Sequence, residues 1–164
     1  MDQQKITQAK NLAANLPVPG YRGTNLSHAQ FKGFVQTTAK HGGASMDATT
    51  GHIYQPGEDA YMVGQAPSIH GSAIQTQVIP GTPSPARAAA AHRSITRQTG
   101  GRPGVAMGSW KDRGSTEIDA SEAYTSRAKA LHVGEDRGEK AIFGMKDMEE
   151  IPTSHRNTVR DYEK

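Results

Sequence analysis

One segment constrains the fold of this chain more than any other: residues 99–121, which read TGGRPGVAMGSWKDRGSTEIDAS. Its strand propensity predicts two strands, at about 105–110 and 116–120. Gly114, within the intervening KDRG, can take the left-handed conformation that ends a short hairpin loop. The sequence therefore predicts that this segment is the central hairpin of a domain, rather than an active-site loop.

Several residues around the hairpin have predicted structural roles. Ile118 is expected on its inner face, and Gly108 is expected where another group approaches the backbone closely. Arg127 falls in the middle of the predicted apolar face of the following helix. Three explanations stay open for it: the helix starts after it, its stem snorkels to water, or it forms a structural ion pair with Asp119 or Glu122.

Three helices are predicted from periodicity and capping signals. A stripe of side chains spaced i, i+3, i+4 and i+7 predicts a helix over 28–40, with Ser27 as its N-cap. An alanine-rich run predicts a second helix from Pro85 to about Gln98, because proline suits the first helical position and two glycines follow the end. A third helix is predicted at 125–136.

Strand propensity appears in several other short segments. They are the hairpin-like ASMDATTGHIYQPG, AYMVG at 60–64, AIQTQVIP at 73–80 and KAIFGM after the third helix. The C-terminal half thus reads strand, strand, helix, strand. This order predicts an α+β fold with a small, mainly antiparallel sheet and two or three packed helices.

The chain divides by composition into one predicted domain and two predicted tails. The domain is expected over 27–151. The first 26 residues are rich in Gln, Asn and Ala and then break at two prolines, so a flexible N-terminal arm is expected at 1–26. Residues 152–164 are polar and are expected to form a flexible C-terminal tail.

The composition limits both the core and the chemistry. Only 34% of the 164 residues are hydrophobic and 5% are aromatic, which predicts a modest core. The chain has no cysteine, and this excludes disulfides, thiolate zinc sites and a cysteine nucleophile. No segment has the length and apolarity of a signal peptide or a membrane span, so a soluble protein without membrane contact is expected.

No familiar catalytic or metal-binding pattern is present. The seven histidines show no metal-ligand spacing and are expected to be scattered on the surface. Gly108-Ser109-Trp110 lacks the frame of a nucleophile elbow. TGGRPG has the glycines of a phosphate-binding nest but is better explained as a helix end followed by a strand entry. We therefore expect no catalytic residue, no metal site and no cofactor.

A basic stretch is the strongest functional signal in the sequence. Residues 84–113 contain six Lys or Arg residues and one Asp, whereas residues 114–164 carry an excess of acids. The residues predicted to contact a partner are Arg87, Arg93, Arg97, Arg102, Trp110, Lys111 and Arg113. Such a row can neutralise phosphates of nucleic acid, can anchor a protein partner, or can be a solvated face that meets the acidic segment.

The C-terminal region also carries a recognisable motif series. Its elements are a Gly-x-Trp strand, a Gly turn, an Asp-x-Ser strand end, an Arg-x-x-Ala helix and an Ala-Ile-Phe strand, here Gly108/Trp110, Gly114, Asp119/Ser121, Arg127/Ala130 and Ala141/Ile142/Phe143. This series resembles a family of uncharacterised proteins encoded by tailed bacteriophages and prophages of actinobacteria. The resemblance covers roughly residues 31–152. The proline- and arginine-rich insert and the Gln-rich N-terminal arm depart from it.

Three functions are compatible with these observations. The leading expectation is a non-enzymatic phage-type accessory protein that binds another protein, of the phage or of its host, either in the virion or in the host cytoplasm. The second is nucleic-acid binding through the arginine row. The third is an enzyme or toxin that uses TGGRPG as an anion loop and Asp119 or Glu122 as acid or base. Self-association into an oligomer stays open.

Overall fold

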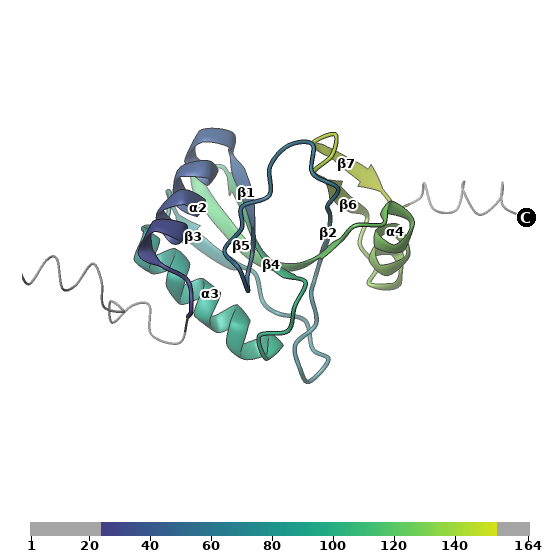
Figure 1. The fold of residues 1–164 in the computed structure, drawn as a ribbon, viewed down its shortest axis with the longest axis horizontal. Coiled ribbons are helices and arrows are strands. Elements are labelled where there is room, and N and C mark those ends of the chain that lie inside the picture. The colour runs from purple at the N-terminus through teal and green to yellow at the C-terminus, as the bar shows by residue number, and fades with distance from the viewer. Residues whose placement is uncertain (1–23, 154–164) are drawn as a thin grey trace, which may run out of the picture.

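The computed structural model describes residues 24–153 of the chain (Figure 1). Most of the predicted N-terminal arm and nearly all of the predicted C-terminal tail lie outside the described residues. The elements are α2 (His28–His41), β1 (Gly43–Asp47), β2 (Tyr61–Gly64), β3 (Gln77–Pro80), α3 (Pro85–Thr99), β4 (Val105–Asp112), β5 (Ser115–Tyr124), α4 (Arg127–Asp136), β6 (Ala141–Gly144) and β7 (Glu149–Pro152).

The seven strands form one sheet whose pairings are antiparallel, so the predicted α+β class is confirmed. The strand order is β1-β4-β5-β2-β6-β7. The long strand β5 serves two partners on one side, because β3 pairs with its first half and β2 with its second half. No helix in the described part of the chain is long and apolar enough to cross a membrane.

Local signals set the limits of the first two helices as the sequence predicts. The Ser27 side chain accepts a hydrogen bond from the Gln30 backbone N–H, and the Gln30 side chain accepts one from the Ser27 backbone N–H, which forms a capping box at the start of α2. Gly42 ends this helix in the left-handed region, with φ of 79°. Ser84 caps α3, whose first residue is Pro85.

The central hairpin is present and longer than predicted. Asp112 pairs with Ser115, so only Arg113 and Gly114 remain for the loop. Both have positive φ, 49° and 82°, as a tight two-residue turn of type I′ requires. Because the turn is so short, Lys111 and Asp112 join the ladder. At its other end β5 continues to Tyr124, past the predicted end at 120, because its second half pairs with β2.

Two predicted strand segments differ from the structure. The hairpin expected within residues 44–57 is reduced to β1 and an isolated bridge between Met46 and Ile53, because the Asp47 carboxylate binds the backbone N–H groups of the next turn. β3 begins at Gln77 rather than near residue 73. Only the first half of β5 is available to it, since the second half already pairs with β2.

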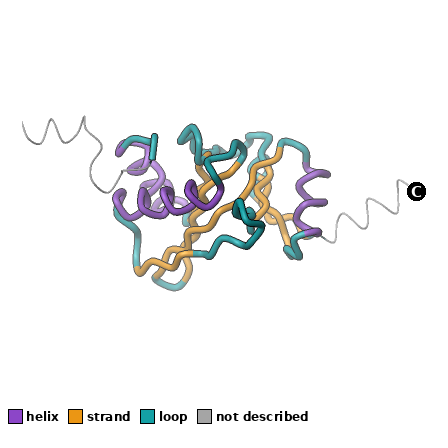
Figure 2. The backbone as a smooth tube through the Cα atoms, turned by 90° about the horizontal axis from the view of Figure 1, so that it is seen from below, coloured by secondary structure: helices purple, strands orange, loops and turns teal. Residues whose placement is uncertain are grey.

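All three helices pack on one face of the sheet, which we call the helix-covered face. Met107 and Ile118 point into the core beneath α2 and α3, where they meet Phe31 and Phe34. At the other end of the molecule, α4 covers β2, β6 and β7 (Figures 1 and 2). Val63 of β2 and Val105 of β4 both pair with Glu122 of β5. Because paired residues of neighbouring strands share a face, Val63 and Val105 lie on the same side of the sheet.

One histidine belongs to this core, which corrects the expectation of surface histidines. The side chain of His92 is fully buried, and its ring meets the edge of Phe31 at a centroid distance of 5.3 Å. Its Nε2 donates to the carbonyl oxygen of Ala48 at 2.7 Å. Burial lowers the pKa of His92, so the ring is neutral and acts as a packed core residue.

Candidate binding cleft

A cleft of about 780 Å³ lies on the opposite side of the sheet, which we call the open face. It crosses β1, β4, β5, β2 and β6, and the segment 54–56 and the β6–β7 hairpin stand at its margins. The last turn of α2 reaches one end of it through Thr37 and His41. Its size is within the usual range for ligand-binding clefts.

The floor of the cleft is low because the strands carry small residues there. Gly108 of β4 lies opposite Asp119 of β5, and Gly64 of β2 lies opposite Ser121. A methyl group on Gly108 would stand 2.6 Å from Asp119 Oδ1, and one on Gly64 would stand 2.6 Å from Glu139 Oε1. Two carboxylates therefore lie directly over two glycines. The close approach expected at Gly108 is made by the Asp119 carboxylate.

The electrostatics of the cleft centre on Asp119. Loss of solvation within the cleft raises the pKa of Asp119 to about 6, and the negative charges of Glu139 and Glu117 add to the effect. Asp119 is nevertheless exposed to solvent at the cleft. The carboxylates lining the cleft are Asp119, Glu139 and Glu150, and no Lys or Arg is among its described lining residues. The cleft is thus an acidic region in a chain of net charge +3.

Apolar side chains form the remainder of the cleft. Trp110 of β4 and Met148 of the β6–β7 turn both line it, although 58% and 46% of their surfaces are exposed. Phe143 lies deeper, next to Met62. Tyr54 donates a hydrogen bond to Asp47, and burial raises the pKa of its phenol to about 12, so this side chain stays neutral. The cleft combines aromatic surface with negative charge.

The seven predicted partner-binding residues do not form one surface. Arg87 and Arg97 are exposed on α3, and Arg93 is partly buried there. Trp110 is three positions after Met107 in β4, and successive side chains of a strand point to opposite faces. The Trp110 side chain therefore lies on the open face, opposite to α3. Lys111 and Arg113 are exposed at the hairpin end. The structure brings Trp110 together with acidic residues instead of arginines. Partner binding by the arginines stays a prediction.

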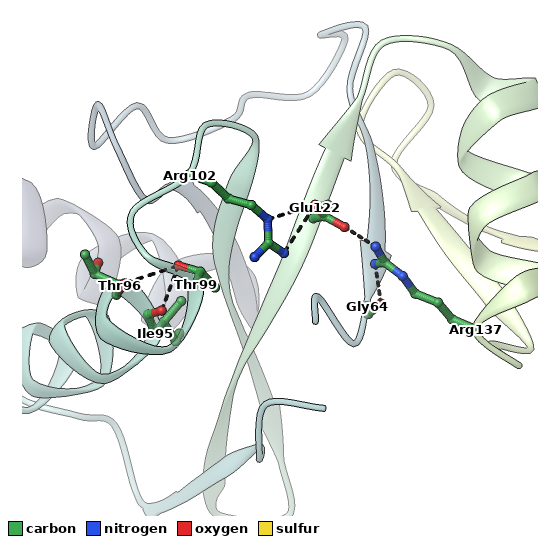
Figure 3. Close-up of polar contacts among 7 residues, drawn as sticks. All are labelled: Gly64, Ile95, Thr96, Thr99, Arg102, Glu122 and Arg137. Carbon is green, nitrogen blue, oxygen red and sulfur yellow. Dashed lines mark hydrogen bonds and ion pairs between the residues drawn. The ribbon is translucent and has the colours of Figure 1, made fainter. Parts of the chain in front are cut away.

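Arg102, the remaining member of that set, has a structural partner. Its guanidinium lies 3.4 Å from the Glu122 carboxylate, and Arg137 contacts the other oxygen of the same carboxylate (Figure 3). Arg137 also donates to the carbonyl oxygen of Gly64 at 3.1 Å. This group connects the end of α3, β5 and the end of α4. The Glu122 carboxylate is therefore held in two ion pairs on the helix-covered face, whereas Asp119 lies on the open face.

The prediction that Arg127 forms an ion pair with Asp119 or Glu122 is wrong. Ser126 caps α4, so Arg127 is its exposed first residue, and the partners of Glu122 are Arg102 and Arg137. Arg137 could not be identified from the sequence, because it follows the helix end, where no periodicity assigns a direction to its side chain. Glu139 and Glu150 could not be identified either, because only the pairing of β2, β6 and β7 brings them near β5. One signal for the open face was present in the sequence: the polar Asp119 directly follows the apolar Ile118, so the two side chains point to opposite faces of the strand.

No protein-family model, curated protein or solved structure matches this chain. Within residues 24–153, no three His, Asp or Glu side chains are grouped so that they could hold a metal ion.

Proposed function

We propose that this protein is a non-enzymatic accessory protein of phage type, and that it works by receiving part of another protein in the cleft of the open face. The observation that carries the proposal is the meeting of exposed Trp110 and Met148 with carboxylates in one cleft. Exposed aromatic side chains beside a hollow are frequent anchors of protein interfaces. The setting, in the virion or bound to a host factor, rests on the motif series that resembles the phage family.

Photo-crosslinking from the cleft tests this proposal. Met148 is replaced by p-benzoylphenylalanine, and the protein is irradiated in host lysate and with purified virions. The matched control carries the same group in place of Ile69, which is 61% exposed beside the end of α3 and does not line the cleft. We expect a defined protein adduct from position 148 that is lost in Trp110→Ala. Equal adducts from both positions, or none from position 148, would contradict the proposal.

Nucleic-acid binding is the second candidate, and the exposure of Arg87 and Arg97 on α3 favours it. Only part of the arginine row is available, since Arg102 is paired with Glu122. Retention on duplex DNA across a salt series is the measurement. Binding that weakens with salt and is lost in the double variant Arg87→Ala/Arg97→Ala would support this function, and binding that ignores salt would reject it.

An enzyme or toxin is the third candidate. It is favoured by a carboxyl group whose pKa is raised to about 6 at Asp119 in a cleft, which suits general acid–base chemistry. The anion loop expected for this mechanism is not beside it, because Arg102 lies on the helix-covered face with Glu122. A phenotype of the expressed protein that disappears in both Asp119→Asn and Asp119→Ala, with folding retained, would support catalysis.

A further inference from the structure

This inference rests on the proposed function and specifies the chemistry of the partner. We propose that the cleft binds a basic segment of the partner protein, with a Lys or Arg side chain over Asp119 and Glu139 and a neighbouring apolar side chain against Trp110. The occupant is thus a cationic peptide segment with one apolar side chain next to the cation.

The charge of the cleft is the first argument. The chain has 19 Lys and Arg residues against 16 Asp and Glu residues, yet the described lining of the cleft includes three carboxylates and no Lys or Arg. Asp119 and Glu139 repel each other in a region of reduced solvation, since Glu139 contributes to the raised pKa of Asp119. A cation relieves this repulsion, an anion increases it, and a neutral group leaves it unchanged.

The geometry of the floor is the second argument. Asp119 lies over Gly108, while Glu139 lies over Gly64, which pairs with Ser121. Asp119 and Ser121 are successive residues of one face of β5, about 7 Å apart along the strand. Gly108 belongs to β4 and Gly64 to β2, so the two carboxylates lie on either side of β5 in the cleft floor. A cationic side chain that enters between them is attracted by both carboxylates, and a guanidinium can donate two N–H groups to one of them.

The apolar margin is the third argument. The exposed large apolar residues of the described chain are Ile69, Val78, Trp110 and Met148, and the last two line the cleft. The Trp110 ring offers apolar surface to a neighbouring side chain and an electron-rich face to a cation. An acidic floor next to an aromatic margin fits a basic residue followed by an apolar one better than a purely polar chain.

Isothermal titration calorimetry with defined peptides tests the inference. The probes are three short peptides with blocked ends, identical except for one central residue, which is Arg, Gln or Glu, next to a Leu in a Gly/Ser background. We expect the Arg peptide to bind about tenfold more tightly than the Gln peptide, a difference of about 1.4 kcal/mol, because hydrogen bonds between charged groups are stronger than those of a neutral amide. We expect the Glu peptide to bind more weakly than both.

Variants locate the binding. Asp119→Asn is expected to weaken the Arg peptide about tenfold and to leave the Gln peptide unchanged. Glu139→Gln repeats the measurement if Asp119→Asn does not fold. The matched control is Asp112→Asn, which removes an exposed carboxylate at the hairpin end outside the cleft, and we expect it to bind like the original protein.

Three outcomes would overturn the inference: no measurable binding of the Arg peptide, equal or tighter binding of the Gln or Glu peptide, or full affinity in Asp119→Asn. Its failure is distinguishable from failure of the proposed function. If crosslinks from position 148 identify a partner while the Arg peptide shows no preference, the binding function stands and the cationic occupant is wrong. If the Arg peptide binds as expected while position 148 yields no adduct, the occupant chemistry stands and the proposed function is wrong.

Discussion

The two faces of the hairpin β4–β5 differ sharply, although they are built from alternate residues of the same strands. On the helix-covered face, Met107 and Ile118 are almost fully buried beneath α2 and α3. On the open face, Gly108 and Asp119 occupy the paired positions immediately next to them. The pair that would be a second apolar layer is instead a glycine covered by a carboxylate whose pKa is raised to about 6.

Within this hairpin, one face contributes to the stability of the fold, and the other face carries the proposed binding site. The helix-covered face supplies the hydrophobic burial that a chain with 34% hydrophobic residues needs. The open face keeps a partly desolvated carboxylate next to other acids, which costs folding free energy and is therefore explained better by binding than by packing. Substitutions on the two faces should accordingly change different quantities.

The largest expected effect is on the helix-covered face. Ile118→Ala should lower the free energy of unfolding by about 3 kcal/mol, because it removes a buried side chain and leaves a cavity in the main core. Urea denaturation measures this change. Glu117→Ala, the preceding residue on the other face, is the matched control and should change stability by less than about 1 kcal/mol. Equal losses in the two variants would show that the faces do not differ as described.

The second effect concerns the link between the two ends of the helix-covered face. Glu122→Ala should cost about 2 kcal/mol, because it leaves the half-buried guanidiniums of Arg102 and Arg137 without their shared carboxylate (Figure 3). Asp59→Ala, which removes an exposed pair with Lys146, should cost less than about 0.5 kcal/mol. Thermal unfolding of both variants is the measurement, and a Glu122→Ala protein as stable as the control would contradict this role.

The third effect has the opposite sign and depends on pH. The folded-state pKa of Asp119 is raised to about 6 from 3.8, so its charged form disfavours folding above that range. Asp119→Asn should therefore stabilise the protein at pH 8 by roughly 1 kcal/mol, a value reduced for the solvent access of the side chain. The gain should shrink as the pH falls from about 6 towards 4. Denaturation curves across this range measure it, and a pH-independent difference would count against the assignment.

The smallest effects are expected on the outer surface of α3. Arg87→Ala and Arg97→Ala should each change stability by less than about 0.5 kcal/mol, because both side chains are exposed. The double variant should also bind the Arg peptide with unchanged affinity, since α3 lies on the side of the sheet away from the cleft. A clear loss of peptide affinity in the double variant, measured by calorimetry, would show that the arginine row takes part in the binding surface.

The parts of the fold that depend on neighbouring residues could be predicted from the sequence. The cap at Ser27, the turn glycine Gly114 and the alanine-rich run of α3 each act over a few residues, and the structure confirms them. The predicted ends of the strands were less accurate. How far β3 and β5 extend depends on which partners remain available in the sheet, and no local pattern contains that information.

The cleft could not be predicted, because its carboxylates come from separate parts of the chain. Asp119 lies on β5, Glu139 follows α4 and Glu150 belongs to β7, and these meet only through the strand order β5-β2-β6-β7. The arginines of α3 and Trp110 lie on opposite sides of the sheet, and no local pattern contains that information. Arg127 has the helix phase of the buried Ala130 and Leu131, but it is the first residue of α4 and is exposed. Periodicity assigns a face of the helix and does not show where the helix begins.

Trp110 offers the most direct test that the open face is the binding face, because it is the only tryptophan of the chain and lies at the cleft. Its fluorescence is measured while the Arg peptide is titrated to the saturation that calorimetry defines. We expect the emission to shift to shorter wavelength and quenching by iodide to decrease, and we expect Asp119→Asn to need about tenfold more peptide for the same change. Saturation of binding with the emission and quenching of Trp110 unchanged would contradict it.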